Sequence, residues 1–407
     1  MELERTEGAD LVRYPSADRI GFARLTTMAF DGADLRPLRD QIMSKIADGT
    51  ADAGEGLDLS LIAQLLGDKP AGLAVQAAVL AFHQLFRSPC SVGQPKLRVL
   101  ALAAPMDMGG NTPIEFLLEH SGIELLTLYV VDGVELPAPL PDHDVAIVIA
   151  SDSEECRNAL RRIERAAPLW PRPLLNPPQR VGNLDRDKLY HLLQGIEGLD
   201  IPATEVVTRV QLSDPARIWR FPILVRPRGS HAGSGLAKVD DGAALERYLA
   251  ERPEPEFFVT RFVDYASADG LFRKYRIVFV DGSAYACHMA IADRWDIWYL
   301  NAGMALSDSK RLEEAGFMQG FDSGFAVRHR QALAALAERV GLDYFTVDCA
   351  ENKNGELLIF EADNTAVVHN MDSPEMFPYK APQMHKIFDA FAAMLTRRAQ
   401  GGRERAA

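Results

Sequence analysis

The sequence predicts a mixed α/β and α+β protein. It has a helical N-terminal region, a small domain built on a parallel sheet, and a larger domain that ends in hairpins. Three observations support this prediction. Apolar residues recur at helical spacing from about residue 18 to 90. Strand-like and helix-like segments then alternate from Leu97 to Ala150, as in parallel sheets. Finally, Asn354-Gly355 separates two apolar runs, a pattern typical of a hairpin.

Composition narrows the class of protein. The chain has 407 residues, enough for two or three domains, and its 47% hydrophobic and 25% charged residues are ordinary for a soluble protein. A net charge of −13 argues against a nucleic-acid or anionic-membrane surface. The start, MELERTEGAD, is unlike a secretory signal, and the apolar segment Ala71–Phe86 falls short of a membrane span. We therefore expect a cytoplasmic protein without nucleic-acid or membrane partners.

Cysteine and histidine usage excludes several kinds of chemistry. Cys90, Cys156, Cys287 and Cys349 are scattered, so we expect reduced thiols rather than disulfides or a metal cluster. The nine histidines form no zinc motif, and no serine lies in a nucleophile elbow. The usual zinc and hydrolase mechanisms therefore lack support.

The N-terminal region, residues 1–92, is expected to be helical, with helices over Leu35–Ile46, Leu57–Leu66 and Ala71–Leu85. It shows no repeat period of a solenoid. We interpret it as a helical cap on the next domain; the alternative is a docking surface or a homodimer surface.

The small α/β domain is expected over residues 93–183. A buried strand at 97–105 leads into the glycine-rich loop Met106–Asn111, and Thr112 to Glu115 has the spacing of a capping box, with a helix predicted to His120. Strands are predicted at Leu125–Val131 and Asp144–Ala150. The loop could hold an anion or a substrate carboxylate at the helix N-terminus, or be a simple connection.

A glycine-rich flap follows in Phe221–Val239, where strand, turn and strand succeed one another. Glycines let the backbone approach a ligand, and two arginines supply positive charge, so the flap could cover phosphates; the alternative is a flexible connection. The candidate phosphate-binding residues are Arg226, Arg228, Gly229, Ser230 and Gly233.

A hairpin is predicted around the turn Asp281-Gly282. Counting from this turn places Lys274 and Arg276 on one face, and His288, opposite Tyr275, on the other. Two cations on a buried strand need an anionic partner, which could be acidic side chains, a phosphate or a purely structural ion pair.

The second hairpin gathers acidic residues. If Asn354 and Gly355 form a two-residue turn, Asp348 lies opposite Glu361, and Asp363 lies on the same face. The other face is expected to carry Phe345, Val347, Cys349, Leu358, Phe360 and Ala362. Leu357 and Ile359 would then share the acidic face, which argues against a hairpin whose acids simply face water.

Opposed carboxylates require compensation. Their Cβ atoms lie only about 5 Å apart, and two such charges about 4 Å apart repel by roughly 4 kcal/mol at an effective dielectric constant of 20. A shared proton or a cation could offset this repulsion. Three oxygen-rich side chains suit Mg²⁺, which keeps waters and takes further ligands from a polyphosphate.

Taken together, the segment from about Leu97 to Arg397 resembles the ATP-grasp superfamily, which includes D-alanine–D-alanine ligases, glutathione synthetases and ribosomal-protein glutamate ligases. The matching features are Asp187-Lys188, Pro202-x-Thr204, Val225-Arg226-Pro227 before the flap, the strand KYRIVFVDG, and Asp348 with Glu361 thirteen positions later. The resemblance implies an ATP-grasp domain over residues 184–400, with a lid at about 200–255, a C-terminal half at about 256–400 and a disordered tail at 401–407.

The resemblance also implies roles for individual residues. It implies ATP and Mg²⁺ as cofactors, with Lys188 and Arg226 on the phosphates and Arg276, beside Lys274, as the catalytic cation. The implied metal ligands are Asp348, Glu361 and either Asp363 or Asn364. The implied hinge beside adenine contains Thr260, Arg261, Phe262 and Val263. Asn301 matches an asparagine near the acceptor in the glutamate-ligase branch, and His288 is a second candidate substrate residue.

Three positions depart from the family pattern. Arg226 stands where the flap normally has lysine, and keeps the positive charge. The hinge lacks the usual glutamate for ribose, and Asp363 occupies the usual asparagine position with Asn364 next to it. The metal could therefore be held by Asp363, or by Asn364 if the strand contains a bulge.

We therefore expect an ATP-dependent ligase that joins a carboxylate to an amine through an acylphosphate, acting on small molecules or peptides. The alternative is a degenerate ATP-grasp protein that binds a nucleotide or a protein partner without catalysis.

Overall fold

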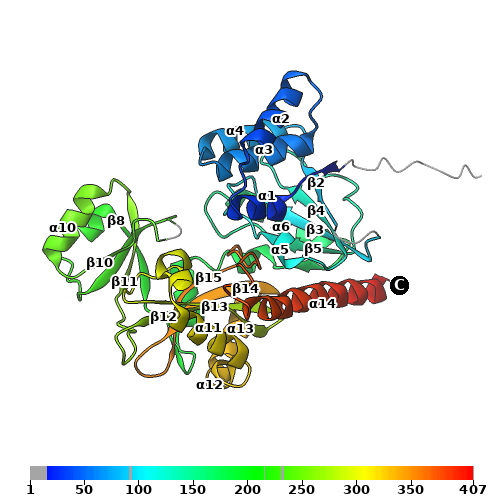
Figure 1. Ribbon diagram of the computed structural model, residues 1–407. Helices are drawn as coiled ribbons and strands as arrows, with labels where there is room; N and C mark the ends of the chain where they lie inside the picture. Colours follow the sequence, from blue (N-terminus) through cyan, green and yellow to red (C-terminus); the bar gives the residue numbers. More distant parts are fainter. Residues whose placement is uncertain (1–15, 91–93, 215, 231–232, 407) are drawn as a thin grey trace, which may run out of the picture.

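The computed structural model describes residues 16–90, 94–214, 216–230 and 233–406. The polar start at residues 1–10, considered above, lies outside them. The described chain forms a six-stranded sheet, a four-stranded sheet and a five-stranded sheet, with helices packed around them (Figure 1). The mixed α/β fold expected from the sequence is confirmed.

The N-terminal region is mainly helical but also contributes strands. Its helices are α1 (Phe22–Phe30), α2 (Arg36–Ala47), α3 (Ala53–Leu65) and α4 (Lys69–Leu80). Asp52 caps α3 in a capping box with Glu55, and Asp68 caps α4. The strands β1 (Ala17–Asp18) and β2 (Leu85–Ser88) join the six-stranded sheet. The third expected helix therefore ends before Leu85, because residues 85–88 form β2, which pairs with both β1 and β4.

The six-stranded sheet has the order β1-β2-β4-β3-β5-β6. Its other strands are β3 (Leu97–Ala103), β4 (Ile123–Tyr129), β5 (Val145–Val148) and β6 (Leu174–Leu175). The helices of this domain are α5 (Ile114–Leu117), α6 (Arg157–Ala166) and α7 (Pro178–Val181), and a 3₁₀ turn, η1, follows α6 at Ala167–Leu169. β3 to β6 are parallel to one another, as predicted, whereas β2 is antiparallel to β4.

The helix predicted after the glycine-rich loop is much shorter than expected. α5 has only four residues and no side-chain cap. Thr112 does not cap it, because its hydroxyl donates instead to the carbonyls of Ile149 and Asn364. Glu115 accepts from the backbone N–H of Ala23 and the hydroxyl of Ser88. The capping-box residues therefore tie distant segments together.

The four-stranded sheet, called the lid sheet below, forms a separate lobe with its own core (Figure 1). Its elements are β8 (Thr204–Thr208), α9 (Arg209–Leu212), β9 (Ile223–Pro227), β10 (Ala237–Val239), α10 (Gly242–Glu251) and β11 (Glu256–Arg261). The strands pair antiparallel in the order β10-β9-β11-β8. The helix α8 (Arg186–Leu193) precedes this lobe.

The five-stranded sheet has the order β13-β12-β14-β15-β7. Its strands are β7 (Leu199–Asp200), β12 (Phe272–Val280), β13 (Ser283–Ala292), β14 (Tyr344–Glu351) and β15 (Leu357–Asp363). The other elements are η2 (Tyr299–Ala302), η3 (Met304–Leu306), α11 (Asp308–Gly320), α12 (Phe325–Arg328), α13 (Arg330–Val340) and α14 (Lys380–Ala406).

The last helix, α14, extends past Arg397, so the tail expected to be disordered from residue 401 is helical to Ala406. Of the helices in the described ranges, none is both long and apolar enough to cross a membrane.

Two buried asparagines join the six-stranded sheet to the five-stranded sheet. Asn176, after β6, exchanges hydrogen bonds with the backbone of Tyr344, each 2.9 Å long. Asn364, after β15, donates to the carbonyl of Ala150 at 2.9 Å. These bonds replace water at buried backbone groups and fix the relative position of the two sheets.

The hairpin β12–β13 has the predicted turn but a different register. Asp281 and Gly282 have φ of 49° and 79°, as a type I′ turn requires. A bulge shifts the register between Arg276 and Ile277, so that Arg276 pairs with His288 and Ile277 with Ala286. His288 therefore lies opposite Arg276 and not Tyr275, on the face predicted for the cations.

The hairpin β14–β15 has a different turn but the predicted acidic pair. Of Asn354 and Gly355, only Gly355 has a positive φ, 78°, and the loop is closed by a bond from the N–H of Asn352 to the carbonyl of Glu356. This loop is one residue longer than the predicted turn. A bulge at Phe360 cancels the difference, and Asp348 pairs with Glu361 as predicted.

Because of this bulge, the side chains at Leu357, Leu358, Ile359 and Phe360 lie on the opposite faces of β15 from those expected. Leu357 and Ile359 pack into the main core with Cys349 and Val347, not on the acidic face. Leu358 and Phe360 instead pack in a separate cluster with Tyr265 and Ala350. Apolar and acidic side chains thus share one face of the sheet, but the apolar ones are not those expected.

We predict that Gly355→Ala lowers the free energy of unfolding by about 1–2 kcal/mol, because an alanine is strained at this φ. Asn354→Ala should change it by less than about 0.5 kcal/mol, as at an ordinary surface position. Denaturant unfolding of both variants measures the difference. An equal loss in both would contradict the observed loop and favour the two-residue turn.

Candidate active site

Four side chains form a row across the five-stranded sheet. The strand registers pair His288 with Arg276, Arg276 with Asp348, and Asp348 with Glu361. Neighbouring strands lie about 4.8 Å apart, so the row runs straight across β13, β12, β14 and β15. We call these four residues the cross-strand row. The two bulges bring its outer members, His288 and Glu361, onto the same face.

Asp348 is the buried centre of the row. Its side chain is 3% exposed, and Arg276 binds it with two bonds, Nε–Oδ1 at 2.7 Å and Nη2–Oδ2 at 3.0 Å. The Nζ atom of Lys274 lies 2.8 Å from Oδ2. Burial opposes the charged form of Asp348, but Arg276 and Lys274 outweigh it, so the pKa of this carboxyl is lowered. The anionic partner required by the two cations is therefore Asp348.

Glu361 is more accessible and pairs with a residue that sequence reasoning missed. Its side chain is 33% exposed and forms an ion pair with Arg186, at the start of α8. Burial opposes its charge, but the charges of Arg186, Lys274 and Arg226 together outweigh burial, and the pKa of Glu361 is lowered. Lys188 is exposed, and its Nζ donates to the carbonyl of Gly182 at 2.8 Å. Residues two apart point in nearly opposite directions on a helix, so only one of these two cations can face the row.

Two further oxygen-bearing side chains follow Glu361. Oδ1 of Asp363 accepts from the N–H and hydroxyl of Thr365, at 2.6 and 2.8 Å. Asn364 is fully buried, and its Oδ1 has no hydrogen-bond partner in the described residues. Burial raises the pKa of Asp363. An orphaned buried oxygen beside a carboxylate is the type of group that a bound cation would satisfy.

Asp152, which follows β5, adds another acidic group that sequence reasoning did not find. Burial, followed by the charges of Asp363 and Asp185, raises the pKa of Asp152 to about 7. Its place near Asp363 depends on the packing of two separate domains, so no local sequence pattern points to it.

The donor set fits Mg²⁺ chemically. Within the described ranges, no three acidic, histidine or cysteine side chains are already arranged to hold a metal ion. However, Asp348, Glu361, Asp363 and Asn364 offer only oxygen atoms, which Mg²⁺ prefers, and such sites usually take further ligands from phosphates. The metal-binding role of these four residues stays a prediction.

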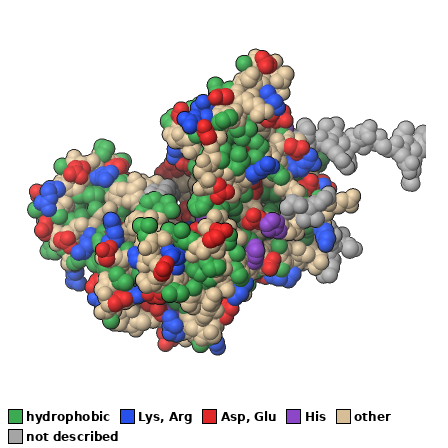
Figure 2. Space-filling model, in the orientation of Figure 1, with side chains coloured by type: hydrophobic (Ala, Val, Ile, Leu, Met, Phe, Trp, Pro, Cys, Tyr) green, Lys and Arg blue, Asp and Glu red, His purple; other side chains and the backbone are tan. Residues whose placement is uncertain are grey.

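The lid sheet approaches this site with positive charge. Arg226 on β9 donates from Nε to the hydroxyl of Ser230 at 3.0 Å, and burial, followed by the charge of Arg186, lowers the pKa of Arg226 to about 10. The guanidinium carbon of Arg186 lies 5.9 Å from the ring centre of Phe258 on β11. Figure 2 shows the surface hollowed between the lid lobe and the N-terminal half of the chain.

The other predicted residues of the flap lie at its surface. Arg228 pairs with Glu256 at 2.9 Å and lies 3.8 Å from Asp185. Gly229 and Gly233 have φ of 75° and 72°, and no atom would touch a Cβ at either position. Their role toward a phosphate stays a prediction.

The predicted hinge residues point in different directions. Thr260 has a buried hydroxyl without a partner in the described residues, whereas Arg261 pairs with Asp200. The ring of Phe262 lies 4.8 Å from Nζ of Lys238. Val263 packs against the apolar cluster on the acidic face of β14 and β15, defined by Tyr265, Ala350, Leu358, Phe272, Trp295 and Phe360. We call this cluster the apolar platform.

The two candidate substrate residues are placed differently. His288 is in the cross-strand row, and its ring centre lies 4.7 Å from that of Tyr299. Asn301 folds its own loop, accepting from the N–H of Trp298 and donating to the carbonyl of Asp296, both at 3.0 Å. The described contacts therefore do not bring Asn301 to the row.

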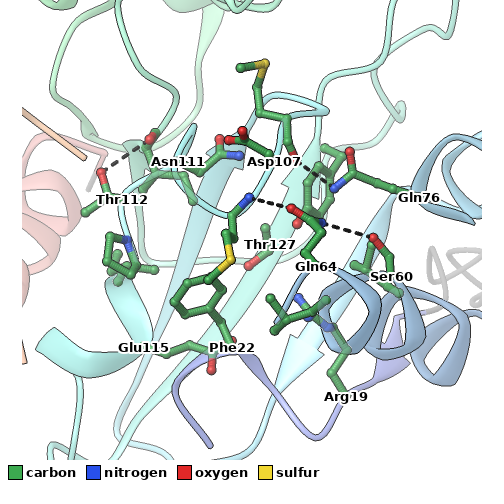
Figure 3. Close-up of a pocket in the computed structure, with 18 of the residues that line it drawn as sticks. Arg19, Phe22, Ser60, Gln64, Gln76, Asp107, Asn111, Thr112, Glu115 and Thr127 are labelled. Atoms are coloured by element: carbon green, nitrogen blue, oxygen red, sulfur yellow. Dashed lines mark hydrogen bonds between the residues drawn. The ribbon is translucent and has the colours of Figure 1, made fainter. Parts of the chain in front are cut away.

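A separate cavity of about 70 Å³ lies between the N-terminal helices and the six-stranded sheet (Figure 3). Gln76 donates to the carbonyl of Met106 at 2.8 Å, and Gln64 accepts from the N–H of Met108 at 2.9 Å. A space of this size holds a few waters. The loop Met106–Asn111 is thus fastened to the helices, and the anion site considered for it is not supported, since α5 is too short.

Comparisons with known proteins give structural matches only. No protein-family model matches the sequence, and no curated protein matches it. The chain is similar to the RimK domain ATP-grasp protein from Sphaerobacter thermophilus DSM 20745 (18% identity, TM-score 0.43, covering 74% of this chain and 99% of that one). It is also similar to the VanG D-Ala:D-Ser ligase from Enterococcus faecalis (12% identity, TM-score 0.45, covering 74% of this chain and 100% of that one). A third match is the D-alanine–D-alanine ligase from Bacillus anthracis complexed with ATP (13% identity, TM-score 0.43, covering 75% of this chain and 99% of that one).

We predict that Asp348→Asn destabilises the fold by about 3–5 kcal/mol, because it leaves Arg276 and Lys274 without their buried counter-charge. Asp281→Asn, which removes a carboxylate that is 32% exposed and paired with the exposed Arg397 and Arg398, should cost about 1 kcal/mol or less. Denaturant unfolding compares the two. Equal effects would show that the Asp348 ion pairs contribute little.

The same variant should change the acid dependence of stability. Because the folded-state pKa of Asp348 is lowered, its contribution is fully present above the ordinary aspartate pKa of about 3.9 and is lost as the pH falls through the folded value. Stability of the unmodified protein should therefore fall more steeply between about pH 4 and pH 2 than that of Asp348→Asn. If stability depends on pH in the same way in both proteins, the lowered pKa of Asp348 is contradicted.

Proposed function

We propose that this protein is an ATP- and Mg²⁺-dependent ligase that joins a carboxylate to an amine through an acylphosphate and forms an amide or peptide-like bond. One observation carries the proposal. The cross-strand row places two carboxylates beside a fixed arginine, on the face of the sheet that the arginine-bearing lid approaches. Metal-bound phosphates and a transferring phosphoryl group need this combination of charges.

Nucleotide binding is supported by three features around the row. Arg186 and Arg226 supply positive charge where phosphates would lie. The apolar platform offers apolar and aromatic side chains next to the hinge, where a purine ring could pack. The unpartnered hydroxyl of Thr260 could bond to the nucleotide. ATP would then lie between the lid sheet and the five-stranded sheet.

Asp348, Glu361, Asp363 and Asn364 would hold Mg²⁺. When bound with ATP, Mg²⁺ would neutralise charge on the phosphate oxygens. Asp348 has a second role in the structure itself, since its two bonds to Arg276 hold the guanidinium in one orientation. Arg276 can then donate hydrogen bonds to the transferring phosphoryl group without reorganisation.

The reaction proceeds in two balanced steps. A substrate carboxylate oxygen attacks the γ-phosphorus, the bond to the β-bridging oxygen breaks, and ADP leaves. The amine then attacks the acyl carbon, the bond from this carbon to the phosphate oxygen breaks, and phosphate leaves with the electron pair while the amine loses a proton. Arg276 and Lys274 stabilise the charge that develops on the phosphoryl and acyl oxygens.

A protein nucleophile is not required, and the buried thiols are poorly suited to be one. Burial raises the pKa of Cys287 to about 12, and it raises that of Cys349 well above its ordinary value. A thiolate is the reactive form of cysteine, so neither residue is activated at neutral pH. Direct transfer to the substrate carboxylate is therefore the simpler chemistry.

We predict that the protein binds ATP only with Mg²⁺ and releases ADP when a suitable carboxylate and amine are present. Glu361→Gln removes a metal ligand and should lower affinity for the metal–nucleotide complex by roughly 10- to 100-fold or more. Calorimetry and coupled ADP assays, with a panel of amino acids and short peptides as substrates, measure both effects.

Glu338→Gln on the exposed face of α13 is the matched control, because it removes the same charge from a residue outside the row. Normal turnover in Glu361→Gln would contradict the metal-binding role of Glu361. ATP binding by the unmodified protein without turnover of any substrate pair would favour the alternative, a protein that binds partners without catalysis. Failure of the unmodified protein to bind ATP with Mg²⁺ would contradict the proposed function.

We predict that Arg226→Ala raises the KM for ATP at least roughly tenfold, since it removes a charged donor from the phosphate region, worth about 1.5–3 kcal/mol. Arg226→Lys should keep most of the affinity because it keeps the charge. Steady-state kinetics with varied ATP tests this. An unchanged KM for ATP in Arg226→Ala would show that Arg226 does not contribute to phosphate binding.

A further inference from the structure

The cross-strand row contains one member that ATP and metal binding do not explain. His288 is placed there by the bulge at Cys287, which turns it from the opposite face to the face of Arg276. Paired side chains have Cβ atoms about 5 Å apart, so the imidazole lies directly beside the guanidinium. Bulges that re-aim a side chain next to a site are typical of functional positions.

The ring of His288 is supported on one side. It lies against Tyr299, at an interplanar angle of 39°. The Tyr299 hydroxyl donates to Glu314 at 3.1 Å and accepts from Lys380, and Glu314 is fully buried and also accepts from Tyr379 at 2.6 Å. This buried network of Tyr299, Glu314, Tyr379 and Lys380 holds the surface against which the imidazole packs.

The nitrogens of His288 are available to a ligand. The ring is half-buried and packs against Tyr299, and no hydrogen bond joins it to another residue in the described part of the chain. The Tyr299 ring limits the rotation of the imidazole. A neutral imidazole nitrogen can then accept a hydrogen bond from a substrate N–H.

The charges around His288 favour neutral forms. Arg276 and Lys274 face it from β12, Asp348 from β14 and Lys380 from α14, while Tyr299 and Glu314 lie behind it. Burial first, and then Arg276, lower the pKa of His288 well below its ordinary value, with Asp348 opposing. The same cations also disfavour a bound ammonium, so an amine in this position is held in its neutral, nucleophilic form.

We propose that His288 contacts the amine substrate and takes the proton that its nitrogen loses as the bond to the acyl carbon forms. This inference rests on the proposed ligase function and deepens it. The bond from nitrogen to carbon forms, the bond from carbon to the phosphate oxygen breaks, phosphate leaves with that electron pair, and the proton moves from nitrogen to the imidazole. Nitrogen becomes strongly acidic once it bonds to the acyl carbon, so a weakly basic imidazole suffices.

The test separates the two halves of the reaction. Hydroxylamine, a strong nucleophile that is largely unprotonated at neutral pH, traps acylphosphates and needs little help from a base. The unmodified protein, with ATP and Mg²⁺, is first supplied with hydroxylamine and a panel of carboxylates, and hydroxamate and ADP are measured. Ammonia, methylamine, the amino acids and their amides then replace hydroxylamine.

His288→Ala should form hydroxamate at close to the unmodified rate, but should transfer the acyl group to basic amines roughly 10²- to 10⁴-fold more slowly at neutral pH. Its amine-dependent rate should rise with increasing pH more than that of the unmodified protein, because a base from solvent then takes the proton in place of His288. His288→Gln, which preserves volume, should show the same split if it folds normally. His385→Ala on the exposed side of α14 is the control and should change neither rate.

The outcomes are distinct. An equal loss of both activities in His288→Ala and His288→Gln would show that the residue is structural, and retention of both would also overturn its role. The proposed role of His288 would also be overturned if the unmodified protein forms hydroxamate but uses none of the basic amines. If the unmodified protein forms neither hydroxamate nor ADP with any carboxylate, the proposed ligase function itself fails, and the role of His288 with it.

Discussion

The buried ion pair between Arg276 and Asp348 is the interaction on which the rest of this structure depends. It joins the two central strands, β12 and β14, through side chains as well as through the backbone ladder. A buried pair of this kind adds little net stability compared with apolar residues, but it is costly to break. In the proposed function, this pair presents a cation in one orientation beside a second carboxylate, Glu361.

The acidic pair could be predicted from the sequence, although the turn it was counted from could not. Asp348 and Glu361 face each other because the longer loop at Gly355 and the bulge at Phe360 offset one another. No such compensation exists in the other hairpin, where the turn at Asp281 was right and the bulge at Cys287 moved His288 to the opposite face. Bulges depend on packing against neighbouring elements, so counting residues from a turn cannot reveal them.

Other parts of the site come from elements far apart in the chain. Arg186 reaches Glu361 across 175 positions, and Asp152 approaches Asp363 from the end of β5. The sequence predicted the strand that precedes Asp152 and the hairpin that carries Glu361, but not the angles at which the domains pack. Lys188 illustrates the same limit, since its motif indicated a phosphate ligand, whereas the helix directs Arg186 toward the row.

The two asparagine links have a mechanical consequence. Asn176 and Asn364 fasten the six-stranded sheet to the five-stranded sheet, whereas the lid sheet has its own core and meets the rest partly through charged side chains. The acidic residues would therefore lie on a fixed part of the protein, whereas Arg226 would move with the lid sheet. In that case all the charges around the nucleotide would be in place only when the lid sheet is closed, so the rate of lid closure would set when the reaction can begin.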